Sequence, residues 1–266
     1  MTSFDLYQAT GLTPQELAEV LQNNPRAYMA VRGAVAEKHL DKVLDGLCQA
    51  GGINSYRRSA GDSEKDFYLQ VGNNTYTIEC KNVEAIKTQK NQGTKVSYIE
   101  YLAEKGYISS LFIDNFMKEI HMAHEGIEML SSSELKSFFK QLPQKYRESS
   151  FVKYEYSASK VPCPQLGILS DDEFVAQFND FPITIDFQRT RNSTDEDGGT
   201  RRNRYYRVGE IDIVAACLFS RTMEWKFLYA RAEEFERHKD YPDRYSNKLR
   251  LQPGLWTSNL QDLIST

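Results

Sequence analysis

The order of hydrophobic and polar positions predicts two helices near the start of the chain. Thr13, Pro14 and Glu16 form the pattern of a helix N-terminus, in which a Thr and a Glu side chain cap the first turn. A second helix is predicted over residues 26–50, and Gly51 with Gly52 ends it. Its predicted apolar face consists of Val31, Val35, Leu40, Val43, Leu44 and Leu47. The polar residues 54–61 that follow predict a loop.

Alternating apolar and polar residues then predict a β-hairpin. Residues 66–72 and 74–82 have the period of strands, and the Gly and Asn residues between them are typical of a tight turn. Residues 84–180 are expected to be mostly helical, most clearly over 109–130 and 131–146. Later strands are predicted at 181–192, 209–219 and 225–232, followed by an irregular tail with aromatic anchors.

This order of elements predicts an α/β fold in which a central mixed β-sheet is flanked by helices, with a largely helical insertion. We divide the chain into three segments. Residues 1–83 hold the N-terminal helices and the hairpin, which form the first part of the core. Residues 84–181 form the helical insertion. Residues 182–266 hold the remaining core strands, an Arg-rich loop and the C-terminal segment.

Composition narrows the class of protein. The chain has 266 residues, of which 40% are hydrophobic, so it can bury a core. It contains no run of 18 apolar residues, and its first residues lack the basic and apolar regions of a secretory signal. The four cysteines lie far apart, without the spacing of a zinc site. We therefore expect a cytoplasmic protein without a membrane span.

The pattern Asp66, Glu79, Lys81 is the strongest indication of chemistry. Residues i and i+2 of a strand point to one face, so Glu79 and Lys81 project together while Cys80 turns inward. The predicted turn would bring Asp66 beside them. Two adjacent carboxylates repel each other unless a divalent cation joins them, and hard oxygen ligands favour Mg²⁺ or Mn²⁺. A lysine beside that metal would position or deprotonate a water, or stabilise charge developing on a phosphate.

This pattern resembles the PD-(D/E)xK nuclease superfamily, which includes many type II restriction endonucleases. The resemblance covers residues 30–82 and 182–232, and Lys65 stands where the superfamily name has proline. It implies a restriction-endonuclease-like core with Asp66 and Glu79 as metal ligands and Lys81 as a catalytic residue. It also implies a supporting acid at Glu37 on the first core helix, with an ordinary solvated helix acid as the alternative interpretation.

The same resemblance implies partners and an activity. The expected activity is Mg²⁺-dependent, sequence-specific cleavage of double-stranded DNA, with Mn²⁺ as a substitute ion and a homodimer as the active form. The helical insertion is the expected place for target recognition. Two alternatives remain: a nuclease of the same core that acts on modified or branched DNA, and a non-catalytic DNA-binding protein with the nuclease fold.

A competing metal site follows later in the chain. Glu210 and Asp212 precede a hydrophobic strand, as the acid of this superfamily does. The next strand, however, has Tyr229 and Arg231 where a second E-x-K would be needed. A site with a single acid would bind metal weakly. We therefore interpret Glu210 and Asp212 as part of a later core strand.

Because the net charge of −4 does not indicate a polyanion partner, DNA binding would depend on local basic patches. Arginines interleaved with Tyr205 and Tyr206 follow the predicted strand at 181–192, and the resemblance would place Gln188 near the acids and Arg191 near a phosphate. The alternative is a solvated loop with internal ion pairs. The predicted DNA-binding residues are Gln188, Arg189, Arg191, Arg201, Arg202, Arg204, Lys87 and Lys90.

Overall fold

A computed structural model of the chain describes residues 6–61, 64–84, 92–148, 152–153, 155–156, 183–189, 202–222 and 224–264. The chain forms two compact units. One comprises Met1–Ala30 and Ala85–Lys160, and the other comprises Val31–Glu84 and Val161–Thr266. The first 30 residues therefore belong with the helical segment, whereas the sequence had grouped them with the hairpin. No helix within the described ranges is long and apolar enough to cross a bilayer.

The first unit is helical, as predicted. It contains α1 (Leu6–Thr10), α2 (Pro14–Asn23), α4 (Gln92–Glu104), α5 (Ser110–Glu119), α6 (Ser132–Gln141), α7 (Gln144–Glu148) and the short 3₁₀ turn η1 (Ile127–Met129). The predicted capping box of α2 is present, because the Thr13 amide donates to Glu16 at 2.8 Å and the Glu16 amide donates to Thr13. Aromatic and aliphatic side chains form a separate core, including Tyr98, Leu102, Phe116, Phe138 and Tyr146.

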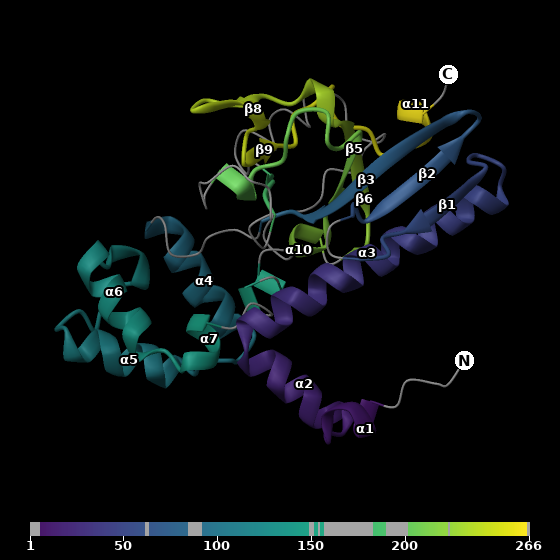
Figure 1. Cartoon of the computed structure of the whole chain (residues 1–266). Helices are drawn as coiled ribbons and strands as arrows, with labels where there is room; N and C mark the ends of the chain where they lie inside the picture. The colour runs from purple at the N-terminus through teal and green to yellow at the C-terminus, as the bar shows by residue number, and fades with distance from the viewer. Residues whose placement is uncertain are drawn as a thin grey trace. The chain divides into compact units, whose positions relative to one another are not determined.

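The second unit is built on a five-stranded sheet with strand order β1-β2-β3-β5-β6 (Figure 1). The strands are β1 (Ser55–Arg58), β2 (Phe67–Val71), β3 (Asn74–Asn82), β5 (Ile213–Cys217) and β6 (Phe227–Arg231). Strands β3 and β5 are parallel and the other pairs are antiparallel. The predicted hairpin is confirmed, with Gly72 at a φ of +56° in its turn. The chain thus has a mixed α/β fold with a mixed central sheet.

Helix α3 (Pro25–Gln49) covers one face of this sheet (Figure 1). Its Ala36, Leu40 and Leu44 are buried against Ile78 and Ile213 of the strands. The buried stripe therefore repeats every fourth residue. Val31 and Val43, which the sequence had placed on the apolar face, are 43% and 37% exposed, so that part of the prediction was wrong.

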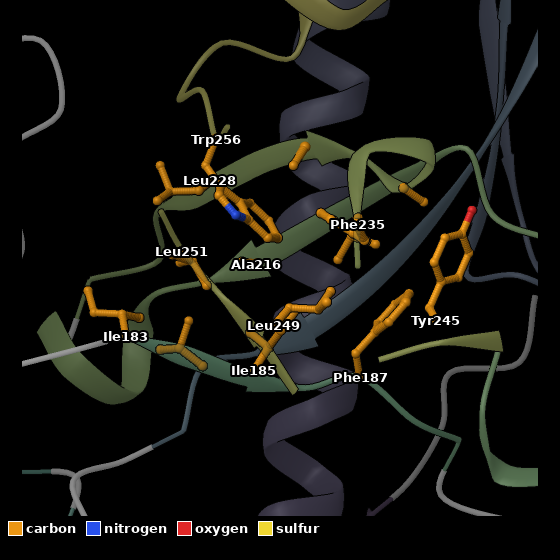
Figure 2. Close-up of a cluster of buried hydrophobic side chains, with 14 of the residues drawn as sticks. Ile183, Ile185, Phe187, Ala216, Leu228, Phe235, Tyr245, Leu249, Leu251 and Trp256 are labelled. Atoms are coloured by element: carbon orange, nitrogen blue, oxygen red, sulfur yellow. The ribbon is translucent and has the colours of Figure 1, made fainter. Parts of the chain in front are cut away.

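A second cluster of buried side chains covers the opposite face (Figure 2). Here β4 (Thr184–Asp186), within the strand predicted at 181–192, pairs with β9 (Lys248–Arg250) in a separate small sheet and not in the central one. Their Ile185 and Leu249 pack toward Ala216 and Leu228 of the central sheet. The short elements nearby are α10 (Phe219–Thr222), η2 (Arg202–Arg204), η3 (Ala232–Glu234), β7 (Arg237–His238), β8 (Tyr241–Tyr245) and α11 (Gln261–Ile264).

Two segments expected to lack regular structure therefore contain strands. Residues 55–58 pair with β2 as an edge strand, and the C-terminal tail contributes β8, β9 and α11. Edge strands need only one hydrogen-bonded neighbour and carry charged side chains easily, so their sequences resemble those of loops. Residues 157–181 of the predicted insertion lie outside the described ranges.

Candidate active site

The β2–β3 hairpin places Asp66 directly beside the E-x-K sequence. Phe67 is paired with Ile78, so one step further along the ladder brings Asp66 opposite Glu79. The Asp66 Oδ2 atom accepts a hydrogen bond of 2.7 Å from the Cys80 amide. The carboxylate is thereby held by the backbone of the strand that carries Glu79 and Lys81. This is the proximity that the spacing of the three residues predicted.

Glu79 and Lys81 project from the same face of β3. Lys81 Nζ lies 2.7 Å from Glu79 Oε1, and the exposed fractions of the two side chains are only 18% and 8%. Cys80 points to the other face, into the core beneath α3. The alternation of the strand therefore separates a chemical face from a packing face.

Glu37 reaches the same region from helix α3. Its Oε2 atom lies 3.5 Å from Arg58 Nη2 of β1, which lies next to β2 in the sheet. Burial raises the pKa of Glu37, and Glu79 raises it further, while Arg58 and Lys81 oppose the change. The pKa of Glu37 therefore depends on the charges of Glu79 and Lys81 in the hairpin. Asp66, Glu79 and Lys81 are thus brought together by the pairing of β2 with β3, whereas Glu37 contacts Arg58 and is linked to them only through charge.

The carboxylates of Asp66, Glu79 and Glu37 carry more negative charge than Lys81 alone can neutralise. Burial, with the nearby Glu79 and Glu37, raises the pKa of Asp66 to about 7, although Lys81 and the Cys80 amide oppose the rise. Burial alone would lower the pKa of Lys81, but Glu79, Tyr206 and Asp66 together raise it well above its usual value. Lys81 is therefore a cation at neutral pH, and one lysine does not neutralise the acids around it.

This charge imbalance is what a divalent cation would correct. Within the described residues, no three His, Cys, Asp or Glu side chains converge as a ready chelating cluster. Asp66 and Glu79 nevertheless supply the hard oxygens that Mg²⁺ prefers. Burial and then the neighbouring Glu79 raise the pKa of Asp66, and a bound cation would oppose both effects. The donor set fits a metal held by two carboxylates, with the remaining positions taken by water or substrate.

Tyr206 is a member of the site to which the sequence assigned no specific role. Its hydroxyl group donates a hydrogen bond to Glu79 Oε1, the same atom that Lys81 contacts. The residue is only 3% exposed, and burial raises the pKa of its hydroxyl group, so it is a neutral donor. The only sequence signal was a pair of tyrosines among arginines, which does not say which tyrosine faces the acids.

Three cations surround the ring of Tyr206. Lys81 Nζ lies 5.4 Å from the ring centroid, Lys65 Nζ 5.5 Å, and the Arg189 guanidinium carbon 5.2 Å. Such contacts are attractive because the face of an aromatic ring is electronegative. The ring thus lies near Lys81 of the hairpin and also near Lys65 and Arg189, which belong to a second group of charged residues.

That second group contains the acid of the competing site. Glu210 Oε1 forms ion pairs with both Lys65 and Arg189, and Glu210 Oε2 accepts a hydrogen bond of 2.8 Å from the Arg207 amide. Asp212, just before β5, accepts hydrogen bonds from the backbone and side chain of Thr77 at 2.8 and 2.7 Å. Both carboxylates are bonded to protein partners, as Asp66 and Glu79 are, so these hydrogen bonds do not rank the two candidate sites.

The predicted DNA-binding residues are placed unevenly. The Gln188 side chain donates to the Asp186 carboxylate at 2.8 Å. The next residue, Arg189, lies near the ring of Tyr206. Arg202 pairs with Asp243 at 2.8 Å, and Arg204 Nε donates to the Arg189 carbonyl oxygen at 3.3 Å. Lys87, Lys90, Arg191 and Arg201 lie outside the described residues.

Comparison of the chain with protein-family models, with curated proteins and with solved structures found no match in any of the three. A fold class alone does not indicate an activity. The function of this chain is therefore inferred from the chemistry of its own side chains.

Proposed function

We propose that this protein is a Mg²⁺-dependent endonuclease of the PD-(D/E)xK type that cleaves double-stranded DNA. The observation that carries the proposal is the convergence of Asp66, Glu79 and Lys81 at one end of the β2–β3 hairpin. Two adjacent acids of low exposure, one of them paired with a lysine, are the groups that metal-dependent phosphodiester hydrolysis requires. An arrangement that only stabilised the fold would gain little from placing Asp66 beside Glu79, because two adjacent carboxylates repel each other.

Asp66 and Glu79 would hold the metal ion. When bound, the ion would polarise the phosphate and lower the pKa of a water molecule so that it attacks at neutral pH. Lys81 is protonated in the metal-free chain, which supports a role in binding the phosphate oxygens and stabilising the charge that develops on them. Tyr206 keeps Glu79 in place by its hydrogen bond to Oε1.

The remaining parts of the proposal concern specificity. We assign target recognition to the helical segment, because the hairpin and its acids read no base edges by themselves. A homodimer, with one active site for each strand, would allow cleavage of both strands of a palindromic target. The Arg-rich segment around Arg189 would contribute contacts with the phosphate backbone.

The decisive experiment is digestion of long, unmodified duplex DNA in the presence of Mg²⁺. The proteins compared are the wild type, Lys81→Met and the control variant Lys226→Met. Lys226 is an exposed lysine that pairs with Glu224 at 2.5 Å. We expect discrete fragments from the wild type and the control. Lys81→Met should lose about 100-fold or more in rate, the loss typical of removing a group that stabilises developing charge, and EDTA should abolish cleavage.

Other outcomes would redirect the proposal. Cleavage by Lys81→Met at the wild-type rate would place the chemistry elsewhere. Cleavage of only methylated or branched DNA would favour a nuclease with a different substrate. Binding to every substrate without cleavage of any would show a DNA-binding protein that is not an enzyme.

A further inference from the structure

Lys65, Arg189 and Glu210 form a compact charged cluster beside the proposed active site. Glu210 Oε1 contacts both cations, and the three side chains are only 12%, 19% and 18% exposed. Glu210 thus joins two cations through one carboxylate oxygen, in a place largely shielded from solvent.

The two cations are already arranged as a binding pair. Arg189 Nη1 donates to the Asn203 carbonyl oxygen at 3.1 Å, which fixes the guanidinium plane while Nη2 contacts Glu210. Lys65 is the residue immediately before Asp66, so the catalytic hairpin sets its position. An arginine fork beside a lysine is a common arrangement for binding phosphate oxygens.

The cluster is also close to the proposed reaction centre. Lys65 and Arg189 both approach the ring of Tyr206, and the hydroxyl group of that ring contacts Glu79. A nucleic-acid strand with one phosphate at the acids and Lys81 would therefore carry a neighbouring phosphate toward Lys65 and Arg189.

We propose that Lys65 and Arg189 bind a backbone phosphate next to the scissile one, and that Glu210 occupies this position in the free protein. This inference rests on the proposed function, because it assumes that the polyanion is DNA bound at the same site. The Glu210 carboxylate presents two oxygens and one negative charge, as a phosphodiester does. It therefore satisfies both cations until the phosphate replaces it.

An alternative is that the cluster only stabilises the fold. The two interpretations predict opposite effects of Glu210→Gln on binding. Glutamine keeps the shape and the acceptor for the Arg207 amide but removes the charge that competes with phosphate. If Glu210 is a stand-in for phosphate, its neutralisation strengthens DNA binding. If it is purely structural, the variant loses stability and gains no affinity.

The test measures binding of a fluorescent duplex by anisotropy in EDTA, so that no cleavage occurs, over a series of salt concentrations. We expect Lys65→Met to bind about tenfold more weakly, with a salt slope reduced by about one, as for the loss of one phosphate contact. Glu210→Gln should bind about tenfold more tightly, because one repulsive charge is removed from the phosphate position. Glu224→Gln, an exposed acid paired with Lys226, is the control and should bind as the wild type does.

Several results would overturn the inference. These are unchanged or weaker binding by a folded Glu210→Gln, an unchanged salt slope for Lys65→Met, or no DNA binding by the wild type at any salt concentration. If Glu210→Gln does not fold, Lys65→Arg and Lys65→Met decide: the arginine variant must keep the affinity and the methionine variant must lose it.

The same variants separate this inference from the nuclease proposal. Cleavage in Mg²⁺ with no response of affinity to Lys65→Met would refute the phosphate position and leave the nuclease intact. The predicted changes in affinity without cleavage of any DNA would refute the nuclease proposal and keep Lys65 and Arg189 as a phosphate-binding position.

Discussion

Replacement of Asp66 by asparagine is expected to stabilise the metal-free protein while abolishing its activity. Burial and the neighbouring acids raise the pKa of this carboxyl group from its usual value of 3.8 to about 7. The folded chain therefore resists ionisation of Asp66, whereas the unfolded chain does not. Asparagine keeps an oxygen that accepts from the Cys80 amide but carries no charge. The substitution thus removes a cost that the fold bears only for its proposed function.

The direction of the pH dependence follows from the raised pKa. Well below pH 3.8 both states are protonated and Asp66 contributes no pH-dependent cost. As the pH rises from about 4 to about 7, the unfolded chain releases its proton first, so the free energy of unfolding falls. Above pH 7 the full cost remains. A rise in pKa from 3.8 to about 7 corresponds to about 4 kcal/mol at 25 °C, which is an upper limit.

The two tryptophans allow this unit to be monitored separately. Trp225 and Trp256 both lie in the unit that holds the hairpin, packed against its two buried clusters. We would follow urea unfolding by tryptophan fluorescence in EDTA at pH 5 and pH 8. The gain in free energy of unfolding from Asp66→Asn should be about 2 kcal/mol or less at pH 5 and about 2–4 kcal/mol at pH 8.

Two results would refute this reasoning. An equal gain at both pH values would mean that the charge of Asp66 is not the source of the cost. A loss of stability at pH 8 would mean that the carboxylate is well compensated in the metal-free chain. As an internal control, Mg²⁺ should stabilise the wild type at pH 8 and stabilise Asp66→Asn much less, because a ligand stabilises only the state that binds it.

Three further predictions concern other residues. Tyr206→Phe removes the hydroxyl group that donates to Glu79, so it should lower the free energy of unfolding in urea by about 2 kcal/mol and slow DNA cleavage about tenfold. The control Tyr205→Phe, at a ring that stacks on His238 at 4.5 Å, should leave the cleavage rate unchanged. Equal effects of both variants would contradict a specific role for Tyr206. Glu37→Gln should change the free energy of unfolding by less than about 1 kcal/mol, because the ion pair of Glu37 with Arg58 is partly exposed. It should nevertheless slow cleavage about tenfold or more. A wild-type cleavage rate would show that Glu37 is an ordinary helix acid. Ser131→Ala removes the capping box of α6 and should cost about 1 kcal/mol in the helical unit, followed by far-UV circular dichroism, whereas Ser110→Ala, which removes no cap, should cost less.

The features that the sequence predicted correctly depend on residues close together in the chain. The alternation over residues 66–82 was enough to predict the hairpin and the shared face of Glu79 and Lys81. The Thr13 capping box could be recognised because its partners are three residues apart. Local periods of this kind follow from the geometry of strands and helices, whatever the rest of the chain does.

Only the tertiary structure decided which distant residues complete the site. Tyr206 is 127 residues from Glu79, and Glu210 is 145 residues from Lys65, so no local period connects them. The pairing of β4 with β9 and the buried stripe of α3 likewise depend on which surfaces the whole unit buries. By itself, the sequence determined the β2–β3 hairpin and the shared face of Glu79 and Lys81. The partners of its charges were selected by the packing of segments far apart in the chain, because burial and ion pairing depend on three-dimensional proximity and not on sequence spacing.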